Sequence, residues 1–436
     1  MQSPWRHLLA AGAICLGAAC GHGSGPGLSP DAADTGSDAG PGNDGAPPED
    51  SASGDGPSLD AGGDSADATT TADVGGEAGE AGEDAPTDAP ADARESGTDA
   101  AVSGGVRIGM NPGEGYTTAD IATWSTYITQ LHATAVRLFF PIYTWTPSGP
   151  DDAAHYYWPD NVTEIQKEIE GYTAQGFRVT VTMAAGPCSS TQVCPGLPAP
   201  TGQTRSDGSP ANQFDEFLQT FVAAIGMADF AKISAVEVWN EWDNAGNGHP
   251  YGYANGSGWA QYTATQYVDD LLHAGYVTLK GYNPNVEIIA GAVITGREAD
   301  IAALAAAGAG QWADAFSYHP YYSTIANLTA GLQTAKSGVP AGKGLTLTEW
   351  GCNAGSIDAP ATSGSASTLT ASFAVLRAAG LEEADYYVLN SAEFAPADQA
   401  AYGLVSAILT GSGPNLQVSS AAAQAPLFNA FEVGAQ

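Results

Sequence analysis

The chain has 436 residues, of which 48 are Asp or Glu and 13 are Lys or Arg, so its formal net charge is −35. Nucleic-acid binding and docking on anionic lipid both depend on clustered cations, and this balance argues against both. A neutral substrate or partner fits the composition better than a polyanion does.

The first 20 residues resemble an export signal. A short basic front at Arg6 and His7 precedes an apolar run from Leu8 to Ala19, which is too short to span a bilayer. Small residues then lead into Cys20, as in a bacterial lipoprotein signal, and we predict that this cysteine is lipidated. An ordinary cleaved secretory signal is the alternative. In either case we expect an exported protein, held at the outer membrane or cell surface by the lipid alone, or secreted.

Residues 21–104 are built almost wholly of Ala, Gly, Asp, Ser, Pro, Thr and Glu, with 19 acidic residues against one basic residue. They show no apolar period of 3.6 or 2.0, so no buried face could offset the entropy of folding. We predict a disordered acidic tether ahead of a single folded domain at 105–436.

Cysteine is sparse after the signal. Cys188 and Cys194 close a short loop, and in an oxidising compartment this spacing predicts a local disulfide, which would leave Cys352 as a free thiol. No pair of histidines has ligand spacing, so we predict neither a metal site nor a cofactor.

From residue 105 on, short β-branched runs alternate with longer helical patterns. The expected strands are 106–111, 135–140, 177–184, 235–239, 286–292, 315–319, 345–349 and 385–389. The expected helices include 118–131, 162–175, 212–225, 259–280, 368–379 and 421–432. Eight strand-then-helix units predict an α/β protein with a (β/α)8 TIM barrel. The alternative, a doubly wound sheet, normally has a G-x-G-x-x-G first turn, which residues 111–115 lack.

Polar and aromatic side chains lie at the carboxyl ends of four expected strands, where a barrel of this kind places its chemistry. They are Arg137 in the second strand, Asn240, Glu241 and Trp242 after the fourth, His319 and Tyr321 at the sixth, and Glu349 and Trp350 at the seventh. Each alone has an ordinary explanation in an ion pair or in core packing. Because buried carboxylates are costly without partners, their gathering at one mouth indicates a functional site.

Two glutamates that face each other across a pocket can cleave a glycosidic bond. One must be protonated to donate to the leaving oxygen, and the other must be ionised to attack the anomeric carbon. Arg137 and Tyr321 would favour the ionised form of one carboxylate, and Asn240 is suited to bind a sugar hydroxyl. His319 would shape the hydrogen-bond network, with a neutral packing role as its alternative.

The motifs Trp239-Asn240-Glu241 and Thr348-Glu349-Trp350-Gly351 resemble the acid/base and nucleophile motifs of the retaining glycoside hydrolases of clan A. Arg137 and the element His319-Pro320-Tyr321 match that clan's pattern as well, and the stretch 267–291 is similar to its family 39 and family 5 members. The resemblance covers residues 105–436.

The resemblance implies that Glu241 is the general acid/base, that Glu349 is the nucleophile, and that configuration is retained. It also implies substrate contacts, which we expect from Arg137, Asn240, His319, Tyr321, Trp242, Trp350 and Tyr387. The clan usually has a tryptophan at the end of strand eight. This chain has Tyr386-Tyr387 there, so we expect that Tyr387 or a loop aromatic replaces the sugar platform, or that the subsite differs.

We therefore predict a monomeric retaining β-glycosidase that cuts a neutral polysaccharide or oligosaccharide internally. Long insertions after strands two, three and four would wall an extended cleft, and aromatic residues, which stack on sugar faces, gather in them. Two alternatives stay open. One is a transglycosylase that remodels β-glycans with the same glutamates, and the other is a non-catalytic carbohydrate-binding barrel.

Overall fold

The computed structural model describes residues 105–112, 118–142, 159–185, 200–243, 263–322, 324–351, 363–389, 403–410, 417–423 and 425–436. The expected signal, the lipidation site at Cys20, the tether at 21–104 and the cysteine pair Cys188 and Cys194 lie outside these residues. None of the helices in the described ranges is both long and apolar enough to cross a bilayer.

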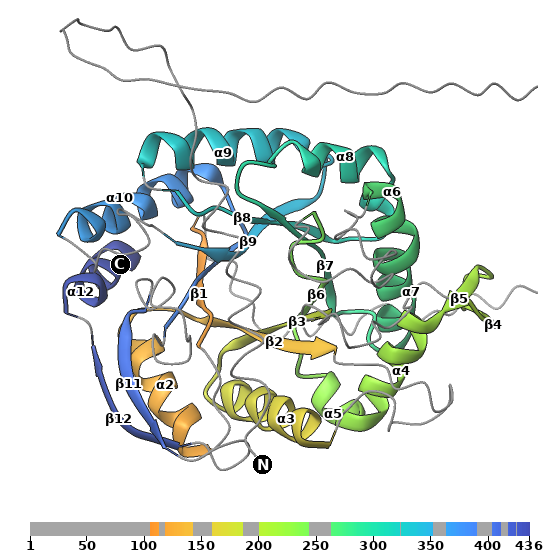
Figure 1. Ribbon diagram of the computed structural model, residues 1–436, viewed down its shortest axis with the longest axis horizontal. Coiled ribbons are helices and arrows are strands. Elements are labelled where there is room, and N and C mark those ends of the chain that lie inside the picture. The colour runs from red at the N-terminus through yellow and green to blue at the C-terminus, as the bar shows by residue number, and fades with distance from the viewer. Residues whose placement is uncertain are drawn as a thin grey trace, which may run out of the picture. The chain divides into compact units, whose positions relative to one another are not determined.

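Eight parallel strands close into a barrel (Figure 1). They are β1 (Arg107–Met110), β2 (Ala135–Ile142), β3 (Arg178–Ala185), β6 (Ala235–Val238), β7 (Glu287–Ile294), β8 (Ala315–His319), β9 (Gly344–Trp350) and β10 (Glu383–Tyr386). Each strand pairs with the next barrel strand along the chain, and β10 closes the barrel against β1, with Arg107 opposite Glu383 and Met110 opposite Tyr386. The predicted (β/α)8 barrel is confirmed, although its last strand begins two residues earlier than expected.

Helices surround the barrel (Figure 1). They are α2 (Thr118–Gln130), α3 (Pro159–Ala174), α4 (Gln213–Ile225), α5 (Met227–Phe230), α6 (Ala264–Tyr267), α7 (His273–Tyr282), α8 (Asp300–Ala306), α9 (Ile325–Gly338), α10 (Ser363–Ala379) and α12 (Ala425–Ala435). A π-helical turn, Val268–Leu272, joins α6 to α7, and a short 3-10 turn, Ala309–Gln311, follows α8. The helix predicted to begin at residue 421 begins at 425, because the preceding residues belong to a strand.

Two antiparallel hairpins lie outside the β/α repeat. One pairs β4 (Pro200–Thr204) with β5 (Pro210–Asn212), and the other pairs β11 (Val405–Thr410) with β12 (Gln417–Ala423) beside α2 (Figure 1). The first hairpin is fixed to the helices that follow it, because Arg205 forms an ion pair with Asp215 in α4 and Asp207 accepts a hydrogen bond from His273 in α7.

Both apolar and polar side chains line the interior of the barrel. Side chains alternate along β6, so Val238 packs outward against Gly275 in α7, whereas Ala235 and Glu237 face inward. Ala235 forms a small apolar cluster with Ile289 and Ala315. Glu237 lies one step nearer the carboxyl end of β6 than Ala235, and it hydrogen-bonds to Arg137, Thr182 and Thr348.

Candidate active site

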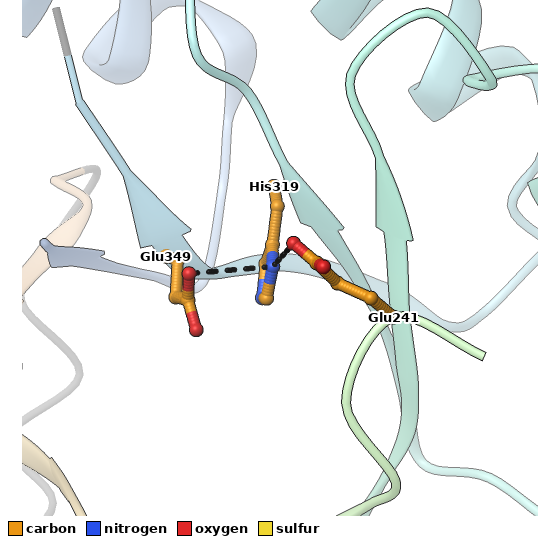
Figure 2. A group of neighbouring side chains, drawn as sticks. All are labelled: Glu241, His319 and Glu349. Atoms are coloured by element: carbon orange, nitrogen blue, oxygen red, sulfur yellow. Dashed lines mark hydrogen bonds and ion pairs between the residues drawn. The ribbon is translucent and has the colours of Figure 1, made fainter. Parts of the chain in front are cut away.

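Glu241 follows β6 and Glu349 lies in β9, and both side chains point toward His319 at the end of β8 (Figure 2). Nδ1 of His319 lies 3.1 Å from Oε1 of Glu241 and 3.6 Å from Oε2 of Glu349. One carboxylate oxygen from each glutamate and one nitrogen of His319 all lie within 4.8 Å of one another. Glu241 is 3% exposed and Glu349 is 7% exposed. The structure thus brings the two predicted glutamates together at the carboxyl end of the barrel.

A strained turn carries Glu241. The backbone φ angles of Trp239 and Glu241 are 74° and 48°, in the left-handed region that side chains other than glycine rarely adopt. The hydroxyl of Tyr267 holds this turn, because it donates to the carbonyl of Val238 at 2.6 Å and accepts from the backbone N–H of Gly291 at 2.6 Å. The ring of Trp242 stacks on Tyr267 with 5.4 Å between centroids, so it supports the same turn.

Two donors hold the carboxylate of Glu349. Arg137 in β2 places Nη1 at 2.7 Å from Oε1, and the hydroxyl of Tyr321 donates to Oε2 at 2.6 Å. Burial raises the pKa of Tyr321 well above its ordinary value, and the negative charge of Glu349 raises it further. The phenol therefore stays protonated and remains a donor to Glu349.

Arg137 is shared between several acceptors. Its Nε and Nη2 lie 2.9 Å and 2.7 Å from Oε2 of Glu237, Nη2 also donates to Oδ1 of Asn240 at 2.8 Å, and Nη1 donates to Oδ1 of Asn111 at 3.1 Å. Burial alone would lower the pKa of Arg137, but Glu237 and Glu349 raise it more, so the guanidinium stays charged.

Glu237 and Asn111 are site residues that were not among those predicted from the sequence. The signal for Glu237 was an acid between two valines in a barrel strand, because alternation then points the carboxylate into the barrel. Asn111 directly follows β1, and its amide nitrogen donates to the backbone carbonyls of Thr348 and Tyr386. No charge or motif marked it.

His319 is fully buried. Its Nε2 lies 2.9 Å from Oγ1 of Thr348, and its Nδ1 faces Glu241. Burial lowers the pKa of this imidazole, but Glu349 and Glu241 raise it by more, and the net direction is upward. The imidazole consequently holds its positive charge to higher pH than an exposed histidine does.

Asp243 is a second buried acid on the turn that carries Glu241. Both of its oxygens lie 3.3 Å from the backbone nitrogen of Ile294, and Arg297 Nε lies 3.7 Å away. Burial raises the pKa of Asp243 to about 7, and the nearby charge of Glu241 contributes.

The prediction that Trp350 contacts substrate was wrong. Its side chain is fully buried, with its ring 5.3 Å from that of Phe373 in α10 and 5.1 Å from that of Tyr386. The pairing of β9 with β10 shifts register between Leu347 and Trp350, so side chains do not alternate regularly there. Thr348 and Glu349 both face the barrel interior, and Trp350 faces the helices.

Tyr387 is half-buried beside the pocket. Its ring meets that of Tyr321 edge-on, with 6.2 Å between centroids and 88° between planes. The peptide bond that follows it, to Val388, is cis. The expected role of Tyr387 as a sugar platform stays a prediction, as do the substrate contacts of the remaining site residues.

Within the ranges that the structure describes, Glu241, His319 and Glu349 form the one group whose atoms are close enough to hold a metal ion. The guanidinium of Arg137 already neutralises Glu349 at 2.7 Å, and a dication there would be repelled by it. The arrangement therefore suits acid–base and nucleophilic chemistry better than metal binding.

No protein-family model matches the sequence, and no curated protein matches it significantly. Solved structures of similar fold include an exo-β-1,4-mannosidase from Opitutaceae bacterium strain TAV5, at 15% identity over 77% of this chain and 60% of that one, with a TM-score of 0.52. A glucosidase from Croceicoccus marinus has 13% identity over 76% of this chain and 66% of that one, with a TM-score of 0.48. A GH39 enzyme from Xanthomonas axonopodis pv. citri has 12% identity over 75% and 65%, with a TM-score of 0.47.

The chain spans less than two thirds of the length of each of these proteins. At these identities the likeness shows the barrel fold alone, and it is the mannosidase structure, with a TM-score of 0.52, that supports it.

Proposed function

We propose that the chain is a retaining β-glycosidase of the clan A type, with Glu349 as nucleophile and Glu241 as general acid/base. One observation carries the proposal: a carboxylate oxygen of Glu241 and one of Glu349 lie within 4.8 Å of each other in a single buried pocket. Retaining enzymes place their two carboxyl groups about 5–5.5 Å apart, whereas inverting enzymes need about 6.5–9.5 Å to admit a water molecule.

The different surroundings of the two acids support their different roles. Arg137 and Tyr321 both donate to the carboxylate of Glu349 and fix its position, and from there it attacks the anomeric carbon and forms a glycosyl–enzyme ester. Glu241 gives its proton to the departing oxygen. It then takes a proton from water, whose oxygen attacks the anomeric carbon and releases Glu349. His319 contacts both carboxylates and can stabilise the negative charge that each carries in turn.

We further propose a neutral polysaccharide or oligosaccharide, cut internally, as the substrate. The 29 acidic and 11 basic residues of 105–436 disfavour polyanions, and the paired rings of Tyr321 and Tyr387 offer an aromatic surface beside Glu349. The same proposal places the enzyme outside the cytoplasm, anchored through lipidated Cys20 on the tether formed by 21–104, and acting as a monomer.

The test uses a panel of aryl β-glycosides of neutral sugars. Glu349→Gln and Glu241→Gln are each expected to lower kcat/KM by about 10³-fold or more, because each removes a group that acts on the reacting bond. Glu287→Gln, which changes an ion-paired glutamate at the first residue of β7 and the opposite end of the barrel, is the matched control and should keep its activity.

Azide distinguishes the two roles. It should restore turnover to Glu241→Ala and give a glycosyl azide of retained configuration, since azide then attacks the glycosyl–enzyme ester in place of activated water. Near-normal activity in either glutamine variant would refute the assignment. Oligosaccharide products longer than the donor, formed with an added acceptor sugar, would identify a transglycosylase, and sugar binding without any release would identify a binding protein.

A further inference from the structure

Glu237 is a buried carboxylate that the mechanism above does not use. It lies in β6 and is fully buried inside the barrel. Its Oε2 accepts from Nε of Arg137 at 2.9 Å and from Oγ1 of Thr182 at 2.5 Å, and its Oε1 accepts from Oγ1 of Thr348 at 2.5 Å. A carboxylate in this position is stabilised only by partners of this kind, and two of its partners lead directly to the active site.

The first connection runs through Arg137. A guanidinium is planar, and its five donors keep a fixed geometry. Glu237 holds the edge formed by Nε and Nη2, and this fixes the direction of Nη1, which reaches Oε1 of Glu349 at 2.7 Å. Glu237 thereby sets the orientation of the cation that holds the proposed nucleophile.

The second connection runs through Thr348. Its hydroxyl has one proton, and because an ionised carboxylate can only accept, that proton is donated to Glu237. Ser317 and His319 also contact Oγ1 of Thr348, at 2.5 Å and 2.9 Å, so both must donate to it. The hydrogen-bond network thus assigns a proton to Nε2 of His319.

The proton on Nε2 determines whether Nδ1 of His319 presents an acceptor or a donor to Glu241. With Nε2 protonated, Nδ1 of a neutral His319 is an acceptor toward Oε1 of Glu241, and Nδ1 of a protonated His319 is a donor. Glu237 also lies 4.0 Å from Nε2, close enough for its charge to favour the protonated imidazole.

We propose that Glu237 is a positioning residue for both catalytic glutamates: it acts on Glu349 through Arg137, and on Glu241 through Thr348 and His319. The catalytic consequence rests on the proposed function. The protonation of His319 follows from the hydrogen bonds alone, and it can be measured without any substrate.

The first experiment is nitrogen-15 NMR of histidine-labelled full-length protein, titrated with pH. The chain has seven histidines, and the signals of His319 are those lost in His319→Asn. We expect neutral His319 to carry its proton on Nε2. We expect Glu237→Gln to lower the pKa of His319 by about one unit, because it removes a neighbouring negative charge. Thr348→Val, which keeps the shape and removes the hydroxyl, should abolish the preference for Nε2.

The matched control is Glu383→Gln. Glu383 is another buried glutamate of the barrel, but it is paired with Arg107 and Arg178 at the amino ends of the strands. The Glu383→Gln substitution should leave the signals of His319 unchanged. A proton on Nδ1 in the unsubstituted protein, or an unchanged pKa of His319 in Glu237→Gln, would overturn the proposal. If Glu237→Gln does not fold, Thr348→Val is the deciding variant: a preference for Nε2 that persists in it would overturn the proposal.

The second experiment is kinetic. Glu237→Gln should lower kcat by about 10²-fold with KM changed by less than about threefold, because it disturbs the catalytic groups and touches no substrate. If no β-glycoside is cleaved while the NMR changes occur, the proposed function fails and the placement of His319 by Glu237 stands. If the enzyme is active and His319 does not respond to Glu237→Gln, the inference fails and the function stands.

Discussion

Asp385 is a fully buried acid inside the barrel, and neither of its carboxylate oxygens has a hydrogen-bond partner among the described residues. Gly109 on the neighbouring strand makes room for it, since a Cβ at that position would lie 1.7 Å from Oδ1. Burial raises the pKa of Asp385 well above its ordinary value, and the charge of Glu383 adds to the effect.

The sign of the linked stability follows from this direction. Above pH 4 or so the unfolded chain releases the proton of Asp385 while the folded protein keeps it, so the free energy of unfolding falls as pH rises toward the folded-state pKa. Asp385→Asn replaces the titrating carboxyl group and so removes this fall in the free energy of unfolding. We expect the variant to gain about 1.4 kcal/mol for each pH unit between the unfolded-state pKa and the pH of the measurement, up to the folded-state pKa, and to gain nothing near pH 3.5.

Urea unfolding between about pH 3.5 and 8 measures the difference. Asp269→Asn, at an exposed position, controls for the simple loss of a negative charge. If Asp385→Asn leaves the slope of stability against pH unchanged, the carboxyl group of Asp385 is ionised in the folded protein and has a partner there.

The turn after β6 shows how one element positions a site residue. A Cβ on Gly291 in β7 would lie 2.4 Å from the carbonyl oxygen of Val238 and 2.5 Å from that of Trp239. Both contacts are to backbone, so Gly291→Ala must displace the turn that carries Glu241. We expect a loss of about 1–3 kcal/mol of stability together with a lower kcat.

Gly281→Ala is the matched control for this prediction. Gly281 lies in α7 with open space where a Cβ would be placed, so the substitution should stabilise the helix by about 0.5–1 kcal/mol and leave kcat unchanged. Thermal unfolding and kcat on one aryl glycoside, measured for both variants, test the pair. Full activity in Gly291→Ala would show that Glu241 does not depend on this close approach.

The barrel strands could be predicted because each is a short apolar run closed by a turn and followed by a helical pattern. The two hairpins could not, because they depart from that repeat, and β4 is polar and largely exposed. Asp207-Gly208 between β4 and β5 was the available signal, since this dipeptide is typical of tight hairpin turns. The end of β12 was mistaken for helix because its alanines fit either structure.

The residues of the candidate site likewise fall into those that could be predicted from the sequence and those that could not. Residues at strand ends, such as Glu241 and Glu349, were predictable because the barrel brings those ends together. The inward direction of Glu237 was predictable from its place between two valines, but its proposed role was not, since that role depends on hydrogen bonds to three other strands. Trp350 was misplaced because a register shift between β9 and β10, which the sequence does not mark, turns its side chain toward the helices.

The two ends of the whole barrel differ in their electrostatics. At the amino ends of the strands, Glu383 is paired with Arg107 and Arg178 at 3.0 Å each, beside a cavity of about 500 Å³ lined by these and further charged side chains. At the carboxyl ends, Arg137 is shared between Glu237 and Glu349. The small apolar cluster of Ala235, Ile289 and Ala315 also lies inside the barrel. The ion pairs at the first end lie away from Glu241 and Glu349, whereas those at the second hold the proposed catalytic groups.

The charge of the catalytic region predicts how the proposed enzyme discriminates between substrates. With 29 acidic against 11 basic residues in 105–436, an anionic substrate is repelled over long range, and Arg137 cannot compensate because two carboxylates already neutralise it. Salt screens this repulsion beyond a Debye length of about 10 Å at 0.1 M. We therefore expect kcat/KM for an aryl β-glucuronide to rise severalfold as ionic strength increases.

The aryl β-glucoside is the matched neutral substrate, and its kcat/KM should stay flat across the same salt series, because no long-range force acts on it. Measuring both substrates in parallel between about 0.01 and 0.5 M NaCl separates screening of the substrate's charge from any effect of salt on the protein itself. A rate on the glucuronide that falls as salt is added would mean that a local cationic surface attracts anions to the pocket, and the substrate class would then have to be anionic.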